Sequence, residues 1–350
     1  MAETTPTDPP AQPPSPRRRR RWRRGLGFVA IALIVSLTAA ELFLRIHYGL
    51  GDPPLSIADP DIEYLFAPSQ EVRRLGNRIH YNAYSMRSDD FPAHKSDPRE
   101  LRVLAIGDSV INGGAQTDQA NLATSILQRK LTQRLGRLVI FGNVSASSWG
   151  PMNELAYVKK YGLFDADVLL IVVSSHDYAD VPTPEPEVGV QLGLPDRKPL
   201  LALQEVVVRY LWPRVTGMTA DATVPDNRPP EQKDIDASLR ALRELIDIGR
   251  SNGAKVVVAQ HWDLDEQSGK PLLPGHELIR KLATDAGATV VQLGPAFRAE
   301  RIAGREPMRD VIHPNTDGQR VIAESLFEEL ERALSGRPAT APTTDATVGQ

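Results

Sequence analysis

Leu101-Arg102-Val103-Leu104-Ala105-Ile106-Gly107-Asp108-Ser109 is the stretch that decides the fold. Its first six residues form a short run rich in apolar strand formers, and a glycine turn that carries a serine follows directly. A serine in this place is well positioned to point its hydroxyl out of a sheet. Near the other end of the chain, Asp310-Val311-Ile312-His313-Pro314-Asn315 supplies an imidazole and a carboxylate. The two segments together hold a nucleophile, a base and a group that can orient the base, which is the minimum set for acyl transfer through serine.

Strand-like and helical patterns alternate from Leu101 onward. After 101–106, the expected strands are 138–141, 168–173, 255–260 and 289–293. The expected helices are 121–135, 152–161, 231–251, 276–285 and about 316–334. This alternation predicts an α/β fold with a mainly parallel sheet wrapped by helices.

Parallel sheets bind ligands at the carboxyl ends of their strands. Three polar segments follow expected strands there: Gly107-Asp108-Ser109, Ser174-Ser175-His176-Asp177 and His261-Trp262-Asp263. We therefore expect the chemistry of this protein at that edge of the sheet.

Composition and charge narrow the class of protein. The chain has 350 residues and no cysteine, which excludes disulfides and thiolate metal sites. Seven arginines against Glu3 and Asp8 give residues 1–24 a net charge of +5, which leaves −8 for the remainder of a chain whose net charge is −3. An acidic body argues against nucleic acid as a partner.

The arginine run directly precedes an apolar segment. Residues 25–45 are about the length that a bilayer core requires, and arginines on the amino-terminal side favour a cytoplasmic N-terminus. We expect a single-pass inner-membrane anchor that contacts the membrane through 25–45, with the rest of the chain on the periplasmic side. A cleaved signal peptide ending near Thr38-Ala39-Ala40 is the closest alternative; a nuclear-type basic patch or a buried core helix does not explain the order of arginines and apolar residues.

The domain organisation follows from these segments. Residues 1–24 are expected to be a disordered basic cytoplasmic tail, and 336–350 a second disordered tail. An irregular juxtamembrane lead-in, 46–98, is expected to pack on the main domain, 99–335, and to contain short strand-like pieces such as Ile79-His80-Tyr81-Asn82. A proline-rich insert at 180–230 interrupts that domain and is equally compatible with a cleft-shaping lid and a passive surface excursion.

Ser109 requires a base, because a free hydroxyl hardly ionises at neutral pH. His313 is the natural candidate, and Asp310, three residues earlier, can accept the second imidazole N–H and fix the tautomer. Gly107 is expected to give the turn its conformational freedom.

These motifs resemble the SGNH (GDSL-type) hydrolase superfamily over residues 99–335. The segment Tyr81-Asn82-Ala83-Tyr84-Ser85-Met86-Arg87-Ser88 is also similar to the Asn-x-x-Gly-x-Arg stretch of membrane-anchored bacterial members. The resemblance implies a flavodoxin-like three-layer α/β/α domain and no cofactor. It also implies Ser109 as nucleophile, His313 as base and Asp310 as its orienting group, supported by Gly107, Asp108 and Asp177.

The sequence departs from the family pattern at two oxyanion-hole positions. Ser148 stands where the family has a glycine, and His176 stands where it has an asparagine donor. The resemblance implies that the backbone N–H groups of Ser109 and Ser148 and the side chain of His176 hold the oxyanion.

A metal site is a weaker alternative. It would join His176-Asp177 to His261, Asp263 and Asp265 at neighbouring strand ends. Trp149, Trp212 and Trp262 could stack on a sugar, although core packing is the commoner role.

The sequence thus predicts an extracytoplasmic serine esterase for acyl esters, with an O-acetyl ester of a polysaccharide as the favoured substrate. Two alternatives remain: an O-acetyltransferase that uses the same acyl-serine, and a catalytically weak scaffold that binds glycan or envelope partners.

Overall fold

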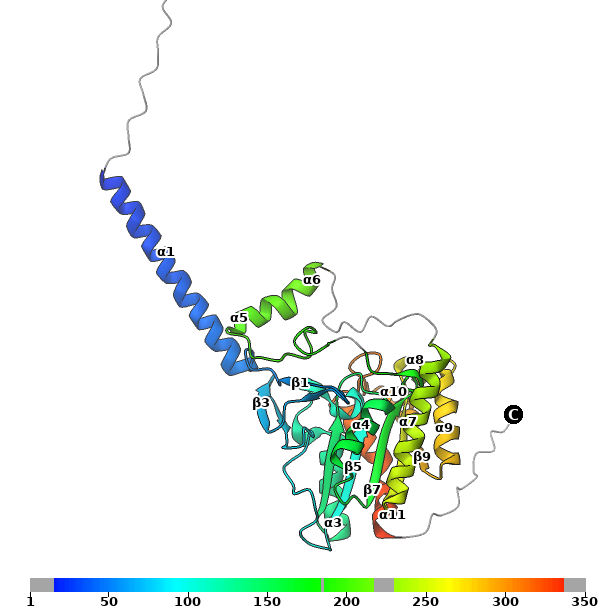
Figure 1. Ribbon diagram of the computed structural model, residues 1–350. Helices are drawn as coiled ribbons and strands as arrows, with labels where there is room; N and C mark the ends of the chain where they lie inside the picture. Colours follow the sequence, from blue (N-terminus) through cyan, green and yellow to red (C-terminus); the bar gives the residue numbers. More distant parts are fainter. Residues whose placement is uncertain (1–15, 184–185, 217–229, 337–350) are drawn as a thin grey trace, which may run out of the picture.

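The fold is built around a five-stranded parallel sheet in the order β6-β5-β7-β8-β9 (Figure 1). The computed structural model describes residues 16–183, 186–216 and 230–336. The strands are β5 (Leu101–Gly107), β6 (Val139–Ser145), β7 (Val168–Ser174), β8 (Lys255–His261) and β9 (Thr289–Gln292). All five predicted strands and the predicted fold class are confirmed.

Helices cover both faces of this sheet. The longer ones are α3 (Ala123–Leu135), α4 (Pro151–Tyr161), α7 (Gln232–Ser251), α9 (Pro274–Asp285), α10 (Gly294–Ile302) and α11 (Thr316–Ser335). Short helices are α2 (Ser109–Asn112), η2 (Gly114–Gln116), η3 (Gln119–Asn121), η4 (Asp177–Ala179) and α8 (Leu264–Gln267). Alternate residues of β5 enter different cores: Val103 packs with α3 and α11, whereas Leu104 packs with α4 and α7. A strand buried on both faces reads as a continuous apolar run, which is why the sequence revealed it.

The lead-in expected to be irregular forms two antiparallel hairpins. They consist of β1 (Ser56–Asp59) with β2 (Glu63–Phe66), and β3 (Gln70–Arg74) with β4 (Asn77–Tyr81). Ile62 and Tyr64 are buried in the same hydrophobic cluster as Leu104 and Trp149. The lead-in therefore contributes to the core beside the sheet.

The N-terminal helix α1 (Pro16–Phe43) projects away from the sheet and continues into η1 (Leu44–Tyr48) (Figure 1). Its segment Trp22–Tyr48 is long and apolar enough to cross a membrane, and the most apolar part of this segment is not buried against the rest of the protein. A signal sequence would have the same length and composition. Of the tails expected to be disordered, 1–24 and 336–350, residues 1–15 and 337–350 lie outside the described residues. Residues 16–24 form the first turns of α1 instead.

Part of the 180–230 insert folds into helices beside α1. These are α5 (Ala202–Glu205), η5 (Val206–Leu211) and α6 (Trp212–Thr216), which follow one another without a break. Arg74 on β3 and Glu205 on α5 form a buried ion pair, which attaches this helical segment to the lead-in.

Candidate active site

Ser109, His313 and Asp310 form a hydrogen-bonded chain at the carboxyl edge of the sheet. The Nε2 atom of His313 lies 2.9 Å from Ser109 Oγ, and its Nδ1 atom lies 2.8 and 2.9 Å from the two carboxylate oxygens of Asp310. A carboxylate only accepts hydrogen bonds, so Nδ1–H donates to Asp310 and the unprotonated Nε2 accepts the hydroxyl proton of Ser109. The structure thus brings together three residues that lie up to 204 positions apart in the sequence.

Backbone N–H groups hold Asp310 in its charged form. Burial raises the pKa of this carboxyl, but the N–H and ring of His313 and the N–H of Ile312 outweigh burial, so the pKa lies below its usual value. The two N–H groups donate to Asp310 Oδ1 at 2.8 and 3.1 Å. Asp310 is therefore ionised at neutral pH and able to stabilise a protonated His313.

His261 forms a hydrogen bond with the loop that carries Asp310 and His313, a role that the sequence did not reveal. It is fully buried at the end of β8, and its Nε2 lies 2.8 Å from the carbonyl oxygen of Ile312. Burial lowers the pKa of His261 to about 4, so the ring is neutral and donates Nε2–H to that carbonyl. A histidine at a strand end next to a candidate site was the available signal.

Position 107 requires glycine because there is no room for a side chain, not because the turn needs a special backbone conformation. The φ of this residue is not positive, and a Cβ atom here would lie 2.6 Å from the carbonyl oxygen of Val172 on the neighbouring strand. The expectation that Gly107 provides conformational freedom is therefore wrong in its reason. Asp108 then caps α2 by accepting the N–H of Val110 at 2.8 Å, which places Ser109 in the first turn of that helix.

Ser148 adopts the left-handed conformation that usually favours glycine. Its φ is +57°, so the backbone retains the geometry expected of the family's glycine despite the side chain. Tyr64 of the lead-in donates its hydroxyl to the carbonyl of Ser147, and Trp149 is buried against Tyr64. The lead-in thus helps to hold the loop that carries Ser148.

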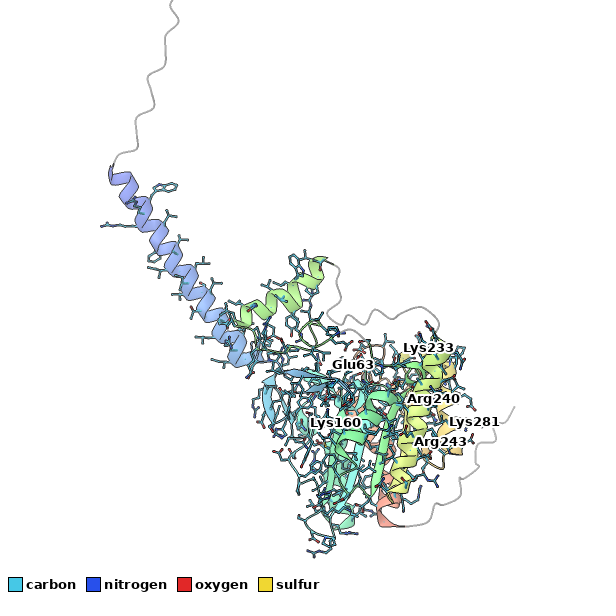
Figure 2. The ribbon with its side chains drawn as sticks, viewed as in Figure 1. Glu63, Lys160, Lys233, Arg240, Arg243 and Lys281 are labelled. Carbon is cyan, nitrogen blue, oxygen red and sulfur yellow. The ribbon has the colours of Figure 1, made fainter. Side chains whose placement is uncertain are left out.

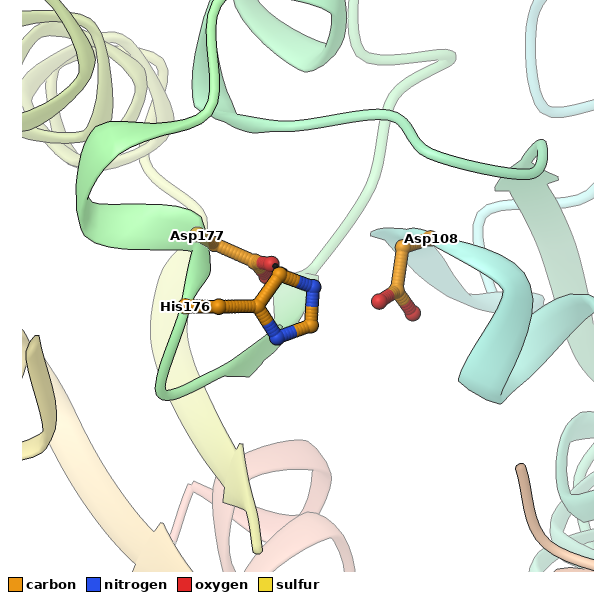
Figure 3. Close-up of side chains that lie close together, drawn as sticks. All are labelled: Asp108, His176 and Asp177. Carbon is orange, nitrogen blue, oxygen red and sulfur yellow. Dashed lines mark ion pairs between the residues drawn. The ribbon is translucent and has the colours of Figure 1, made fainter. Parts of the chain in front are cut away.

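His176 lies beside buried carboxyl groups rather than in the pocket lining. Asp108, His176 and Asp177 each offer a ligand atom within 4.8 Å of the others, and Figure 3 shows the His176 ring next to both acids. The His176 Nε2 atom lies 3.1 Å from Asp177 Oδ1. Among the residues the structure describes, Asp108, His176 and Asp177 are the group whose spacing could hold a metal ion. The metal site that the sequence suggested, with His261, Asp263 and Asp265, is not assembled, because His261 forms a hydrogen bond with the carbonyl of Ile312.

Burial also affects the acids of this group. It raises the pKa of Asp108 to about 7, with a further contribution from the negative charge of Asp177. The pKa values of Asp177 and of the fully buried Glu154 on α4 rise well above their usual range for the same reason. Glu154 contacts no hydrogen-bond partner with either carboxylate oxygen, so we expect it to be uncharged.

A pocket of about 360 Å³ opens over Ser109 and His313. Its walls come from three parts of the chain: the main domain, the lead-in and the insert. The lead-in and insert contribute Pro54, Tyr64, Phe66, Arg74, Leu75, Ile79, Tyr81, Arg87, Glu187, Gln191, Gly193, Leu194, Arg209 and Tyr210. Of the two interpretations of the insert, the structure favours the one in which it shapes a cleft.

Arg87 connects the lead-in to the nucleophile turn. It is buried, and its guanidinium donates to the carbonyls of Asn112, Gly114 and Thr117. Ser85, at the position of glycine in the motif Asn-x-x-Gly-x-Arg, has a φ of +61°. Two serines in this chain therefore occupy left-handed positions where the family pattern has glycine.

The comparisons with known proteins agree with this geometry. Residues 105–321, more than half of the chain, match the GDSL-like lipase/acylhydrolase family. The chain belongs to this family. It is therefore an ester-hydrolysing enzyme of the GDSL type, as the resemblance of its motifs implied. No curated protein matches this sequence significantly.

Solved GDSL structures are similar to this enzyme at low identity. A lipolytic GDSL-family protein from Veillonella parvula is 14% identical, with 66% of this chain and 99% of that chain covered and a TM-score of 0.42. A GDSL-like lipase described as putative from Parabacteroides merdae is 15% identical over 65% and 94%, with a TM-score of 0.43. An acetylxylan esterase from Geobacillus stearothermophilus is 14% identical over 66% and 94%, with a TM-score of 0.41.

Proposed function

We propose that this GDSL enzyme is an extracytoplasmic, membrane-anchored serine esterase in which Ser109, His313 and Asp310 are the catalytic residues. The chain of short distances from Ser109 Oγ through the imidazole to the Asp310 carboxylate is the observation that carries the proposal. The apolar segment Trp22–Tyr48 supports the anchor.

The first half of the reaction is acyl transfer to Ser109. His313 Nε2 accepts the proton of Ser109 as Oγ attacks the ester carbonyl, and Asp310 stabilises the resulting imidazolium. The N–H groups of Ser109 and Ser148 stabilise the oxyanion. The His176 side chain, which pairs with Asp177 outside the pocket lining, is the candidate for a third donor. His313 then donates its proton to the leaving alcohol. In the second half, water loses a proton to His313 and attacks the acyl-serine carbonyl. The bond to Ser109 Oγ then breaks, His313 returns the proton to that oxygen, and the acid is released.

The favoured substrate is an O-acetyl ester of a glycan. The pocket combines aromatic rings with amide side chains, including Tyr81, Tyr210, Gln116 and Gln191. Rings that stack on sugars and amides that bond to hydroxyls are a combination suited to carbohydrate. An O-acetylated glycan is therefore the first substrate class to test.

The test uses the full chain in detergent and an activated aryl acetate, with and without an acetylated xylan or a glycan acceptor. We expect ester turnover that Ser109→Ala reduces to background, with Ser88→Ala, a buried serine outside the pocket, as the control. Turnover that requires an acceptor would favour the acetyltransferase. No Ser109-dependent turnover in either condition would leave the scaffold interpretation.

The oxyanion role of His176 has its own test. His176→Asn restores the donor that the family pattern has, whereas His176→Ala removes it. If His176 binds the oxyanion, the alanine variant loses about 10²–10³-fold in kcat and the asparagine variant recovers much of that loss. If both variants keep the activity of the unmodified enzyme, His176 does not contact the reacting atoms.

A further inference from the structure

The helical segment formed by α5, η5 and α6 presents an apolar face to solvent. Its exposed apolar residues are Val207, Val208, Leu211, Trp212 and Val215, with Leu200 and the extended residue Leu201 directly before it. Positions 208, 211 and 215 recur at helical spacing and so share one side of the helix. Each of these side chains is between 44% and 86% exposed. Gln204 and Arg214 are polar exposed residues on the same segment.

The opposite side of this segment carries the charges. Glu205 is buried, pairs with Arg74 and accepts the N–H of Gly51 at 2.6 Å. Arg209 and Tyr210 are half-buried and line the pocket that contains Ser109. A surface helix of a soluble domain has the reverse arrangement, with its apolar side against the core. The apolar side therefore requires a different environment from water.

The beginning of the segment is fixed to the end of α1. The Glu41 carboxylate accepts the N–H groups of Ala202 and Leu203 at 2.8 and 2.9 Å. Arg45 pairs with Glu41 at 2.6 Å and donates to the carbonyl of Leu200 at 2.7 Å. In Figure 1, the segment runs across the direction of α1, on the side of the domain from which α1 leaves. A helix in this position beside a membrane span would lie along the membrane surface.

We propose that residues 200–216 dock on a phospholipid bilayer as an interfacial helix, with Leu201, Val208, Leu211, Trp212 and Val215 in the headgroup and upper acyl region. This inference rests on the proposed membrane anchor. Helices of this kind bind through one apolar side, and tryptophan is favoured at that depth. Because Arg209 and Tyr210 on the inner side line the pocket, docking holds the mouth of the active site next to the membrane surface. The enzyme then acts on esters that are presented close to the bilayer.

The absence of cysteine makes a direct test possible. Single cysteines are introduced into the full chain as Leu211→Cys, Ile34→Cys in α1, and Lys281→Cys on α9, which lies far from α1 (Figure 2). Each variant is labelled with a polarity-sensitive fluorophore and reconstituted in vesicles of phosphatidylethanolamine and phosphatidylglycerol. Spin-labelled phospholipids serve as quenchers. We expect several-fold stronger quenching at position 211 than at position 281, with quenchers near the headgroup more effective than deep ones.

The three positions separate the possible outcomes. Quenching at 34 without quenching at 211 would overturn the docking proposal and leave the anchor intact. Lack of quenching at both positions would contradict the anchor and the docking together. A fluorophore at 211 that is shielded from water but not quenched by lipid, with 211–211 crosslinking between chains, would assign the surface to a second copy instead.

Discussion

The backbone of Ser148 is held in a conformation that costs a residue with a Cβ about 1 kcal/mol or more. Its φ of +57° keeps its N–H in the loop beside the nucleophile. We expect Ser148→Gly to leave the N–H in place and to change the free energy of unfolding by between 0 and about +1 kcal/mol, because relief of strain offsets the entropy of glycine. Denaturant unfolding measures this, and ester turnover should persist.

Ser147 is a matched control for that variant. It is an exposed serine in the same loop, and its φ is not positive. Ser147→Gly should therefore destabilise the protein by about 0.5–1 kcal/mol. If both variants lose the same stability, the left-handed conformation of Ser148 imposes no strain.

Asp108 provides a second prediction at the residue scale. Burial and the charge of Asp177 raise its pKa to about 7. Between its unfolded pKa and about 7, the folded state retains a proton that the unfolded state has lost, so this group makes stability fall as pH rises. Asp108→Asn should therefore raise Tm by more at pH 8 than at pH 5.

For Asp118, the pKa shift has the opposite sign to that of Asp108. It also caps a helical turn through its carboxylate, at 2.9 Å from the N–H of Ala120. Burial raises its pKa, but the N–H groups of Arg78 and Ala120 and neighbouring arginines lower it below its usual value. Asp118→Asn should lower Tm at both pH values. A rise in Tm for Asp118→Asn, or no pH dependence for Asp108→Asn, would contradict the assignment.

At the scale of elements, the strand β8 supports the loop that carries the base. His261 donates to the carbonyl of Ile312, one residue before His313. His261→Phe fills the site but removes the donor, so we expect kcat to fall about tenfold to 10²-fold with little change in KM, because small misplacements of a catalytic group are costly. His261→Gln retains an N–H and should recover part of the loss. Equal losses in both variants would indicate packing rather than the hydrogen bond.

The elements that the sequence predicted are those with local signals. The run 168–173 is apolar throughout because β7 is covered on both faces, and α7 has a clear apolar side. In the lead-in, the strand-like stretch Ile79-His80-Tyr81-Asn82 overlaps β4, but the pairing of four short strands into two hairpins was not predicted, because strand pairing between short segments leaves no periodic pattern in the sequence. The motifs around Ser109 and His313 identified the candidate site. Arg87 belongs to a recognisable motif and His261 follows a predicted strand, but the atoms that these two side chains contact lie in distant segments and could not be predicted.

At the scale of the whole molecule, the lead-in and the insert meet beside the pocket. The pocket wall includes Arg74 of the lead-in and Arg209 of the insert. Both segments also form hydrogen bonds with the region where α1 ends. The division into a lead-in at 46–98 and a hydrolase domain at 99–335 remains a prediction. Because the two parts share one hydrophobic cluster, we expect 99–335 not to fold stably alone. Truncation at residue 98 would expose the part of the core that Ile62 and Tyr64 cover.

The orientation of the chain in the membrane gives the last prediction. The arginines before residue 25 favour a cytoplasmic N-terminus, and a single span then places Ser109 outside. We expect a membrane-impermeant maleimide to label Lys281→Cys in intact spheroplasts, because Lys281 is exposed on α9. Ala2→Cys, on the other side of the span, should react only after lysis. Labelling of Ala2→Cys before lysis, with Lys281→Cys protected, would reverse the topology and place the esterase chemistry in the cytoplasm.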